Sequence, residues 1–135
     1  MRARLTGMRA RLTGSDRDRG ALFVEFAGLF PLILVMVAVI WQCILIGYTF
    51  SLAGNAADQA ARAAAAADGD AEGACVAAAT EGLPGAWSAD VSCPLEGNVR
   101  VAHVDLQVPV LFPGALNLPM TISGSAGAAE ENRER

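Results

Sequence analysis

Residues 17 to 50 read RDRGALFVEFAGLFPLILVMVAVIWQCILIGYTF, a long apolar run that follows a basic segment. From Ala21 to Asn55 the only side chain that carries a charge at neutral pH is Glu25. Its most apolar part, Leu22 to Ile46, has 25 residues. At a rise of about 1.5 Å per residue this makes roughly 37 Å of helix, enough to cross a hydrocarbon core of about 30 Å with some tilt. We therefore predict a transmembrane helix over residues 22–46.

The charges on the two sides of this stretch differ in sign. Six arginines and two aspartates precede Ala21, whereas four arginines and twelve acidic residues follow it. The positive-inside rule places residues 1–20 in the cytoplasm and the rest outside the cell membrane. Trp41 and Tyr48 lie near the predicted outer end, where interfacial aromatic residues are enriched. An acidic body also argues against nucleic-acid binding.

A cleaved secretory signal is an alternative for the same stretch. Such signals have an apolar region of about 7 to 15 residues and end at small residues. This run is longer and ends in Trp, Gln, Cys and Tyr, and the nearest Ala-rich sequence comes only after Leu52. The length therefore favours a retained membrane anchor over a signal that signal peptidase removes.

Helical character continues beyond the apolar run. Pro31 inside the run predicts a bend over residues 27–31, because proline removes one helix hydrogen bond. Residues 51–67, SLAGNAADQAARAAAAA, are mostly strong helix formers. Asp58 and Arg62 stand four residues apart, as a favourable pair on one helix face does. We predict one helix over residues 21–67, whose Ala-rich second part forms a stalk.

The residues around Gly20 resemble those of a known family. Gly20 is followed by ALFVEF, with Glu fifth and an aromatic residue sixth after the glycine, which resembles the processing site of type IV prepilins. VEFAGLFPLIL followed by NAADQAARAAA is similar to the TadE/TadG-like pilin-related proteins of the Tad (Flp) pilus system. The resemblance is strongest over residues 17–67 and looser over 98–131. The short part after the helix favours TadE over TadG.

The resemblance implies a route of processing and assembly. A membrane prepilin peptidase would cut between Gly20 and Ala21 and remove the basic leader, residues 1–20. Glu25, followed by Phe26, would then neutralise the new amino group of Ala21 in its own or a neighbouring subunit. The implied partners are this peptidase, other pilin-like subunits, the Tad membrane assembly platform and membrane lipid. Because MRARLTG occurs at 1–7 and again at 8–14, the leader starts at Met1 or at Met8.

The sequence after the stalk predicts a small outer domain over residues 68–128, with a disordered tail at 129–135. Alternating residues over Val99–Val110 predict a strand, with a bulge or a bend at 103–104 where the apolar phase changes. The other expected elements are a helix at 71–81, a strand at 87–93, a turn at 112–114, a returning strand at 118–123, and a frayed segment from 124 onward. The fold class is α+β and membrane-anchored: a long transmembrane and stalk helix, then a small helix and a two- or three-stranded antiparallel sheet.

The three cysteines differ in their predicted surroundings. Cys75 and Cys93 both fall outside the membrane, where a disulfide can form, and closing their loop would stabilise the domain by about 3 kcal/mol. Cys43 lies in the predicted span as an apolar filler. His103 lacks companions for a zinc site, so we predict neither metal nor cofactor.

The sequence predicts a structural protein. No Ser–His–Asp grouping, phosphate-binding glycine loop or carboxylate pair suggests catalysis, so we predict that the chain is not an enzyme. Our leading hypothesis is a TadE-like minor pilin or pseudopilin in Tad pilus assembly. The alternatives are an uncleaved single-pass membrane protein whose outer domain binds a partner, and a secreted small disulfide domain.

Overall fold

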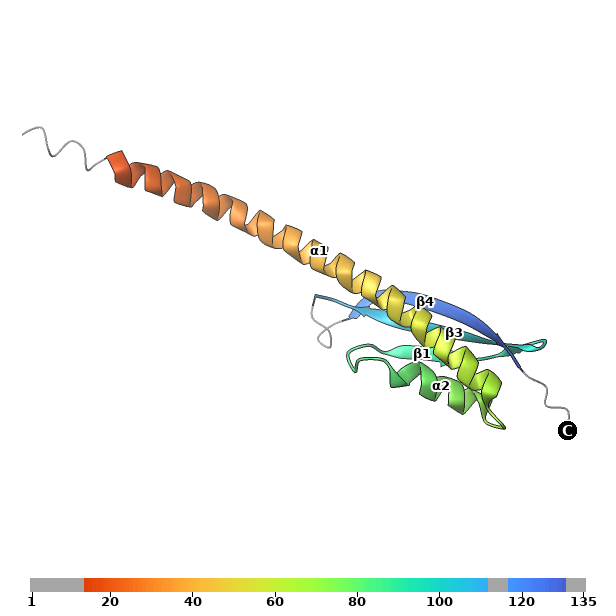
Figure 1. Cartoon of the computed structure of the whole chain (residues 1–135). Coiled ribbons are helices and arrows are strands. Elements are labelled where there is room, and N and C mark those ends of the chain that lie inside the picture. Colours follow the sequence, from red (N-terminus) through yellow and green to blue (C-terminus); the bar gives the residue numbers. More distant parts are fainter. Residues whose placement is uncertain (1–13, 112–116, 131–135) are drawn as a thin grey trace, which may run out of the picture. The chain divides into compact units, whose positions relative to one another are not determined.

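The computed structural model describes residues 14–111 and 117–130, and the surroundings of side chains in 19–111 and 118–130 (Figure 1). The elements are α1 (Gly14–Ala66), α2 (Ala71–Glu81), β1 (Ala89–Ser92), β2 (Leu95–Glu96), β3 (Val99–Pro109) and β4 (Asn117–Ala129). This order confirms the predicted fold class, and the sheet has four strands rather than two or three. The chain divides into two compact units, residues 1–40 and residues 41–135.

The described part of the first unit is the N-terminal part of α1. Its large apolar side chains, from Leu22 to Ile40, are exposed to the surroundings instead of packing on other parts of the chain. Pro31 lies inside the helix, and helical structure continues on both sides of it. The helix is long and apolar enough to cross a membrane. The predicted bend over 27–31 stays a prediction.

In the second unit the remainder of α1, residues 41–66, packs against the sheet. The buried positions recur every three or four residues, as one face of a helix does. These positions are Leu45, Thr49, Ala53, Ala56, Ala57, Ala60, Ala61 and Ala64. Alanine is a strong helix former with a small side chain, so this face lets the helix backbone approach the sheet closely. The segment predicted as a stalk therefore forms part of the domain core.

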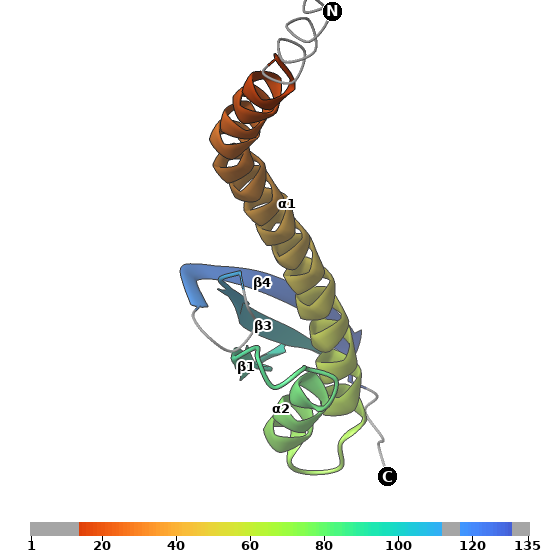
Figure 2. The ribbon, with the colours of Figure 1, turned by 90° about the vertical axis from the view of Figure 1, so that its left-hand side faces the viewer.

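β3 is the central strand of the sheet. β4 runs antiparallel along one side of β3, from Val99 opposite Ala129 to Pro109 opposite Asn117. β1 and β2 share the other side of β3, with β1 opposite 103–106 and β2 opposite 99–100. The face of the sheet that points inward is built from alternate residues and forms one core with α1 and α2. Figure 2 shows α2 beside the last turns of α1.

The predicted bulge at 103–104 is wrong. Pairing between β3 and β4 is continuous from Val99 to Gln107, and the register shifts between Gln107 and Pro109. The buried residues of β3 are Ala102, Val104, Leu106 and Val108, with Pro109 buried beyond the shift. The apolar phase does not change in the structure, because Ala102 supplies the inward position and Val101 faces the other side. The irregularity falls at Pro109, which has no N–H to give to the ladder.

β4 is longer than the predicted strand at 118–123. The segment GSAGAA at 124–129, expected to fray, continues the strand to Ala129. A Cβ at Gly124 would stand 2.3 Å from the carbonyl oxygen of Ala53 in α1. Only glycine fits at that distance, so the low strand propensity of this segment is offset by direct contact with the helix. Glu130 continues the pairing with the β3 side, since its N–H donates to the Asn98 carbonyl at 3.0 Å. The tail beyond it lies outside the described residues.

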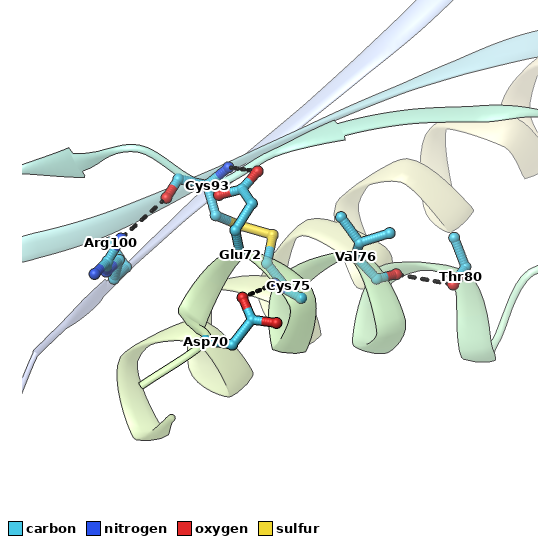
Figure 3. The surroundings of a disulfide bond; sticks show 8 residues. Asp70, Glu72, Cys75, Val76, Thr80, Cys93 and Arg100 are labelled. Carbon is cyan, nitrogen blue, oxygen red and sulfur yellow. Dashed lines mark hydrogen bonds between the residues drawn. A yellow bond between two sulfur atoms is a disulfide. The ribbon is translucent and has the colours of Figure 1, made fainter. Parts of the chain in front are cut away.

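The disulfide predicted between Cys75 and Cys93 is present and joins α2 to the end of β1 (Figure 3). Both sulfurs belong to buried residues. Asp70 caps α2 by accepting a hydrogen bond from the Gly73 N–H at 2.8 Å. Glu72 in the first turn accepts from the Cys93 N–H at 3.3 Å. The disulfide and the hydrogen bond between Cys93 and Glu72 hold the first turns of α2 against the end of β1.

Candidate functional site

The predicted processing site lies within helical structure. Gly20 and Ala21 are both inside α1, and both are exposed. A protease that binds its substrate extended would have to unwind this turn first. Gly20 lowers the cost of unwinding, because glycine in a helix is about 1 kcal/mol less favourable than alanine. A side chain at Gly20 would meet no other atom within 4 Å, so the fold itself does not require glycine here.

Glu25 follows Ala21 by four residues, about one turn of α1. The two positions therefore share a face of the helix. Neither ion pair found among the described residues includes Glu25. In the uncut chain the nitrogen of Ala21 is a peptide N–H and carries no charge, so a cut before Ala21 would create the cation that Glu25 lacks. Phe26, the next residue, packs its ring 5.8 Å from that of Phe30.

A second group of functional interest lies where the outer domain begins. The side-chain amide of Gln42 donates to the Pro109 carbonyl at 3.0 Å and accepts from the Leu111 N–H at 2.9 Å. The indole N–H of Trp41 donates to the Leu111 carbonyl. We call Trp41, Gln42, Pro109 and Leu111 the helix–hairpin joint. It ties α1 to the end of β3 by side chains of two successive residues.

The joint holds Leu111 in a backbone conformation that is uncommon for its type. Leu111 has a φ of 49°, in the left-handed region, where any residue other than glycine costs about 1 to 2 kcal/mol. Both polar backbone groups of Leu111 are bonded to α1, which offsets this cost. Gln42 falls inside the span predicted over residues 22–46, and its role in the joint was not predicted. The sequence signal for this role is a polar amide within an apolar run, because a polar group in such a run needs a hydrogen-bond partner.

A buried hydroxyl joins α1 to the segment after α2. Thr49 is fully buried, donates to the Leu45 carbonyl at 2.7 Å, and accepts from the Trp87 indole N–H at 3.0 Å. The Trp87 ring also stands edge-on to Tyr48, with ring centres 5.5 Å apart. These contacts fix residues 41–49 of α1 to the outer domain. Together with the joint they place this segment in contact with protein on one side.

Polar side chains also line a shallow pocket on the outward side of the sheet. The pocket, of about 280 Å³, is lined by Ser88, Ala89, Asp90, Asp105, Gln107 and Thr121. Asp90 and Asp105 lie opposite each other in the register of β1 and β3, and the Ser123 hydroxyl donates to Asp105. Among the described residues no group of three or more His, Cys, Asp or Glu could hold a metal ion.

A known protein family resembles part of α1. A family model described as TadE-like protein matches residues 20–62, about a third of the chain, and all of these residues belong to α1. No curated protein and no solved structure matches the chain. The matched segment begins at Gly20 and contains both Glu25 and the joint residues Trp41 and Gln42. The match confirms the resemblance that the sequence indicates: residues 20–62 are similar to a TadE-like protein.

Proposed function

We propose that this protein is a minor pilin or pseudopilin that acts in assembly of a Tad-type pilus. The observation that carries the proposal is a TadE-like helix in which Gly20, Ala21 and Glu25 have prepilin spacing. In this proposal residues 1–20 face the cytoplasm, α1 crosses the membrane once, and the outer domain lies outside the cytoplasm. A prepilin peptidase cuts between Gly20 and Ala21.

The cut gives Glu25 its partner. An unpaired carboxylate in an apolar surrounding is costly, and an ammonium group on the same helix face removes that cost. The amine comes from Ala21 of the same chain or of an adjacent pilin-like subunit. An adjacent amine would also fix the axial position of one subunit against the next, because a shifted helix leaves both charges unpaired.

The contacts of residues 41–49 move the proposed outer boundary of the membrane span. Leu45 and Thr49 are buried by the outer domain and Gln42 is half-buried there, so they are not surrounded by lipid. The twenty residues 21–40 remain for the span, and at about 1.5 Å per residue they cover roughly 30 Å. We propose a span over residues 21–40 in place of the one expected over 22–46.

The secreted alternative conflicts with the packing of α1. Signal peptidase cleavage near residues 50–60 would remove Leu45 and Thr49, and part of the helix face that covers the sheet. The packing thus favours an anchor that stays joined to the outer domain.

The processing step is tested by the N-terminus of the product. The full chain is co-expressed with an active prepilin peptidase, and the product is identified by N-terminal sequencing and mass. We expect a start at Ala21 for the wild type and no cut for Gly20→Val, because a branched side chain hinders binding in the cleft. Gly28→Val, in the same exposed stretch of α1, is the matched control and is cut normally. An intact wild-type N-terminus beside a second prepilin that is cut would contradict the proposal, and a start near residues 50–60 would favour secretion.

The pairing role of Glu25 needs a separate measurement. Glu25→Gln keeps the shape of the side chain and removes its charge. We expect this variant to be cut like the wild type but to give at least tenfold less cross-linked product with other pilin-like subunits, which corresponds to about 1.4 kcal/mol. Glu72→Gln, in the outer domain, serves as the charge-matched control. If Glu25→Gln is cut and assembles normally, the pairing role is wrong.

A further inference from the structure

The helix–hairpin joint stands at the end of the proposed membrane span. Trp41 is the first residue after residues 21–40, and its indole N–H is bonded to the Leu111 carbonyl. Leu111 must therefore lie at nearly the same depth as Trp41. The headgroup regions of a bilayer add about 5 to 7 Å on each side of the hydrocarbon core. Tryptophan is enriched in that layer at the ends of membrane spans.

The chain around the joint carries no charge. From Phe26 to Ala57 and from Leu106 to Ala129 the sequence contains no Asp, Glu, Lys, Arg or His. These ranges include the end of β3 and the whole of β4. Several large apolar side chains at this end are exposed, namely Trp41, Ile44, Leu111 and Met120. Such a surface avoids the cost of bringing charged groups out of water to a lipid interface.

The polar backbone groups at the joint have hydrogen-bond partners within the protein, as a layer with little free water requires. Polar backbone groups that are away from water need partners within the protein. At the joint the Pro109 carbonyl, the Leu111 N–H and the Leu111 carbonyl are all bonded to Trp41 or Gln42. The end of a strand in bulk water would not need three such bonds from side chains.

We propose that the helix–hairpin joint docks the outer domain on the headgroup layer of the bilayer that the chain's own helix spans. The occupant of this surface is lipid, and the inference rests on the membrane span proposed above. Continuity with that span, the absence of charge and the bonded backbone groups all favour lipid over a water-filled gap. In this arrangement Gln42 is a positioning residue that holds Leu111 at the depth of Trp41.

Depth-dependent quenching tests the proposal. The full chain, with Cys43→Ala to leave no free thiol, receives a single cysteine that is labelled with an environment-sensitive fluorophore. The protein is reconstituted in phosphatidylcholine vesicles that contain a lipid with a nitroxide on its headgroup or on its acyl chain. The labelled variants are Leu111→Cys at the joint, Val35→Cys in the span, and Leu95→Cys on β2.

Leu95 is the matched control because it is an exposed leucine at the other end of the sheet. It pairs with Arg100, nine residues before Pro109 on β3, which is roughly 30 Å along the strand. We expect the headgroup nitroxide to quench the label at 111 at least threefold more than the label at 95. The acyl-chain nitroxide should quench the label at 35 most.

The outcomes separate the two proposals. Quenching at 35 but equal, low quenching at 111 and 95 overturns the docking and leaves the span intact. Equal strong quenching at 111 and 95 also overturns it, since the domain would then lie flat on the lipid. Absence of lipid quenching at 35 overturns the span and the docking together.

A further variant tests the part assigned to Gln42. Gln42→Ala in the Leu111→Cys protein removes two bonds to the strand end, and we expect at least a twofold fall in headgroup quenching at 111. Gln59→Ala, at an exposed position of the same helix, should leave the quenching unchanged. Equal quenching in all three proteins would contradict the positioning role of Gln42.

Discussion

The two halves of α1 belong to one helix but carry opposite kinds of apolar surface. In residues 21–40 bulky Leu, Val, Ile and Phe side chains are exposed all around the helix. In residues 41–66 one face is buried, and from Ala53 onward that face consists of alanine alone. A lipid surrounding favours bulk on every side, whereas a sheet that must be approached closely favours small side chains on one side. Hydrophobicity alone therefore does not distinguish a span from a core helix; side-chain size and its distribution around the helix do.

The largest expected effect comes from adding bulk to the second half. Ala60 is fully buried between α1 and the rest of the outer domain. Ala60→Leu adds three carbon atoms where no space exists, and we expect the free energy of unfolding of the outer domain to fall by about 3 kcal/mol. Chemical denaturation in detergent, followed by near-ultraviolet circular dichroism, measures this change.

Ala38→Leu is the matched control in the first half. The same three carbon atoms there enter a surface that large apolar residues already occupy, so the stability of the outer domain should not change. If Ala60→Leu were as stable as Ala38→Leu, close packing of α1 on the sheet would be wrong.

A smaller effect is expected on the sheet side of the same contact. Gly124→Ala places a methyl group against the backbone of Ala53, so either α1 or β4 must shift. We expect a loss of about 2 kcal/mol in unfolding free energy. Gly54→Ala, on α1 with nothing within 4 Å of the added carbon, should instead be neutral or stabilise by up to about 1 kcal/mol. Equal melting temperatures for the two variants would show that the approach at Gly124 is looser than described.

The elements that the sequence predicts are those with a local pattern, whereas elements that depend on tertiary contacts with α1 were missed. The apolar helix, α2, β3 and the pairing of Cys75 with Cys93 follow from local patterns: length, periodicity, alternation and cysteine position. The strand over 124–129 does not, because glycine and alanine have low strand propensity and the contact of Gly124 with α1 is tertiary. The irregularity of β3 was also not predictable at its true place, since an alanine such as Ala102 fits either face of a strand.

The candidate site was predictable to a similar degree. Gly20, Ala21 and Glu25 stand out because their spacing is contained within a few residues. Gln42 does not stand out, because its partners Pro109 and Leu111 are 67 and 69 residues away along the chain. Tertiary contacts of that kind leave no local pattern except an isolated polar residue in an apolar run.

The smallest effect is expected where α1 changes from one kind of surface to the other. Thr49 is the buried polar residue of this transition, and its hydroxyl accepts from the Trp87 indole at 3.0 Å. Thr49→Val keeps the shape but leaves that N–H without its acceptor, so we expect a loss of about 1 kcal/mol in unfolding free energy and a shift in Trp87 emission. Thr49→Ser keeps the hydroxyl and should retain the wild-type emission, although it loses a methyl group. If Thr49→Val retained wild-type stability and emission, the change of surroundings along α1 would depend on alanine packing alone, without a fixed polar contact.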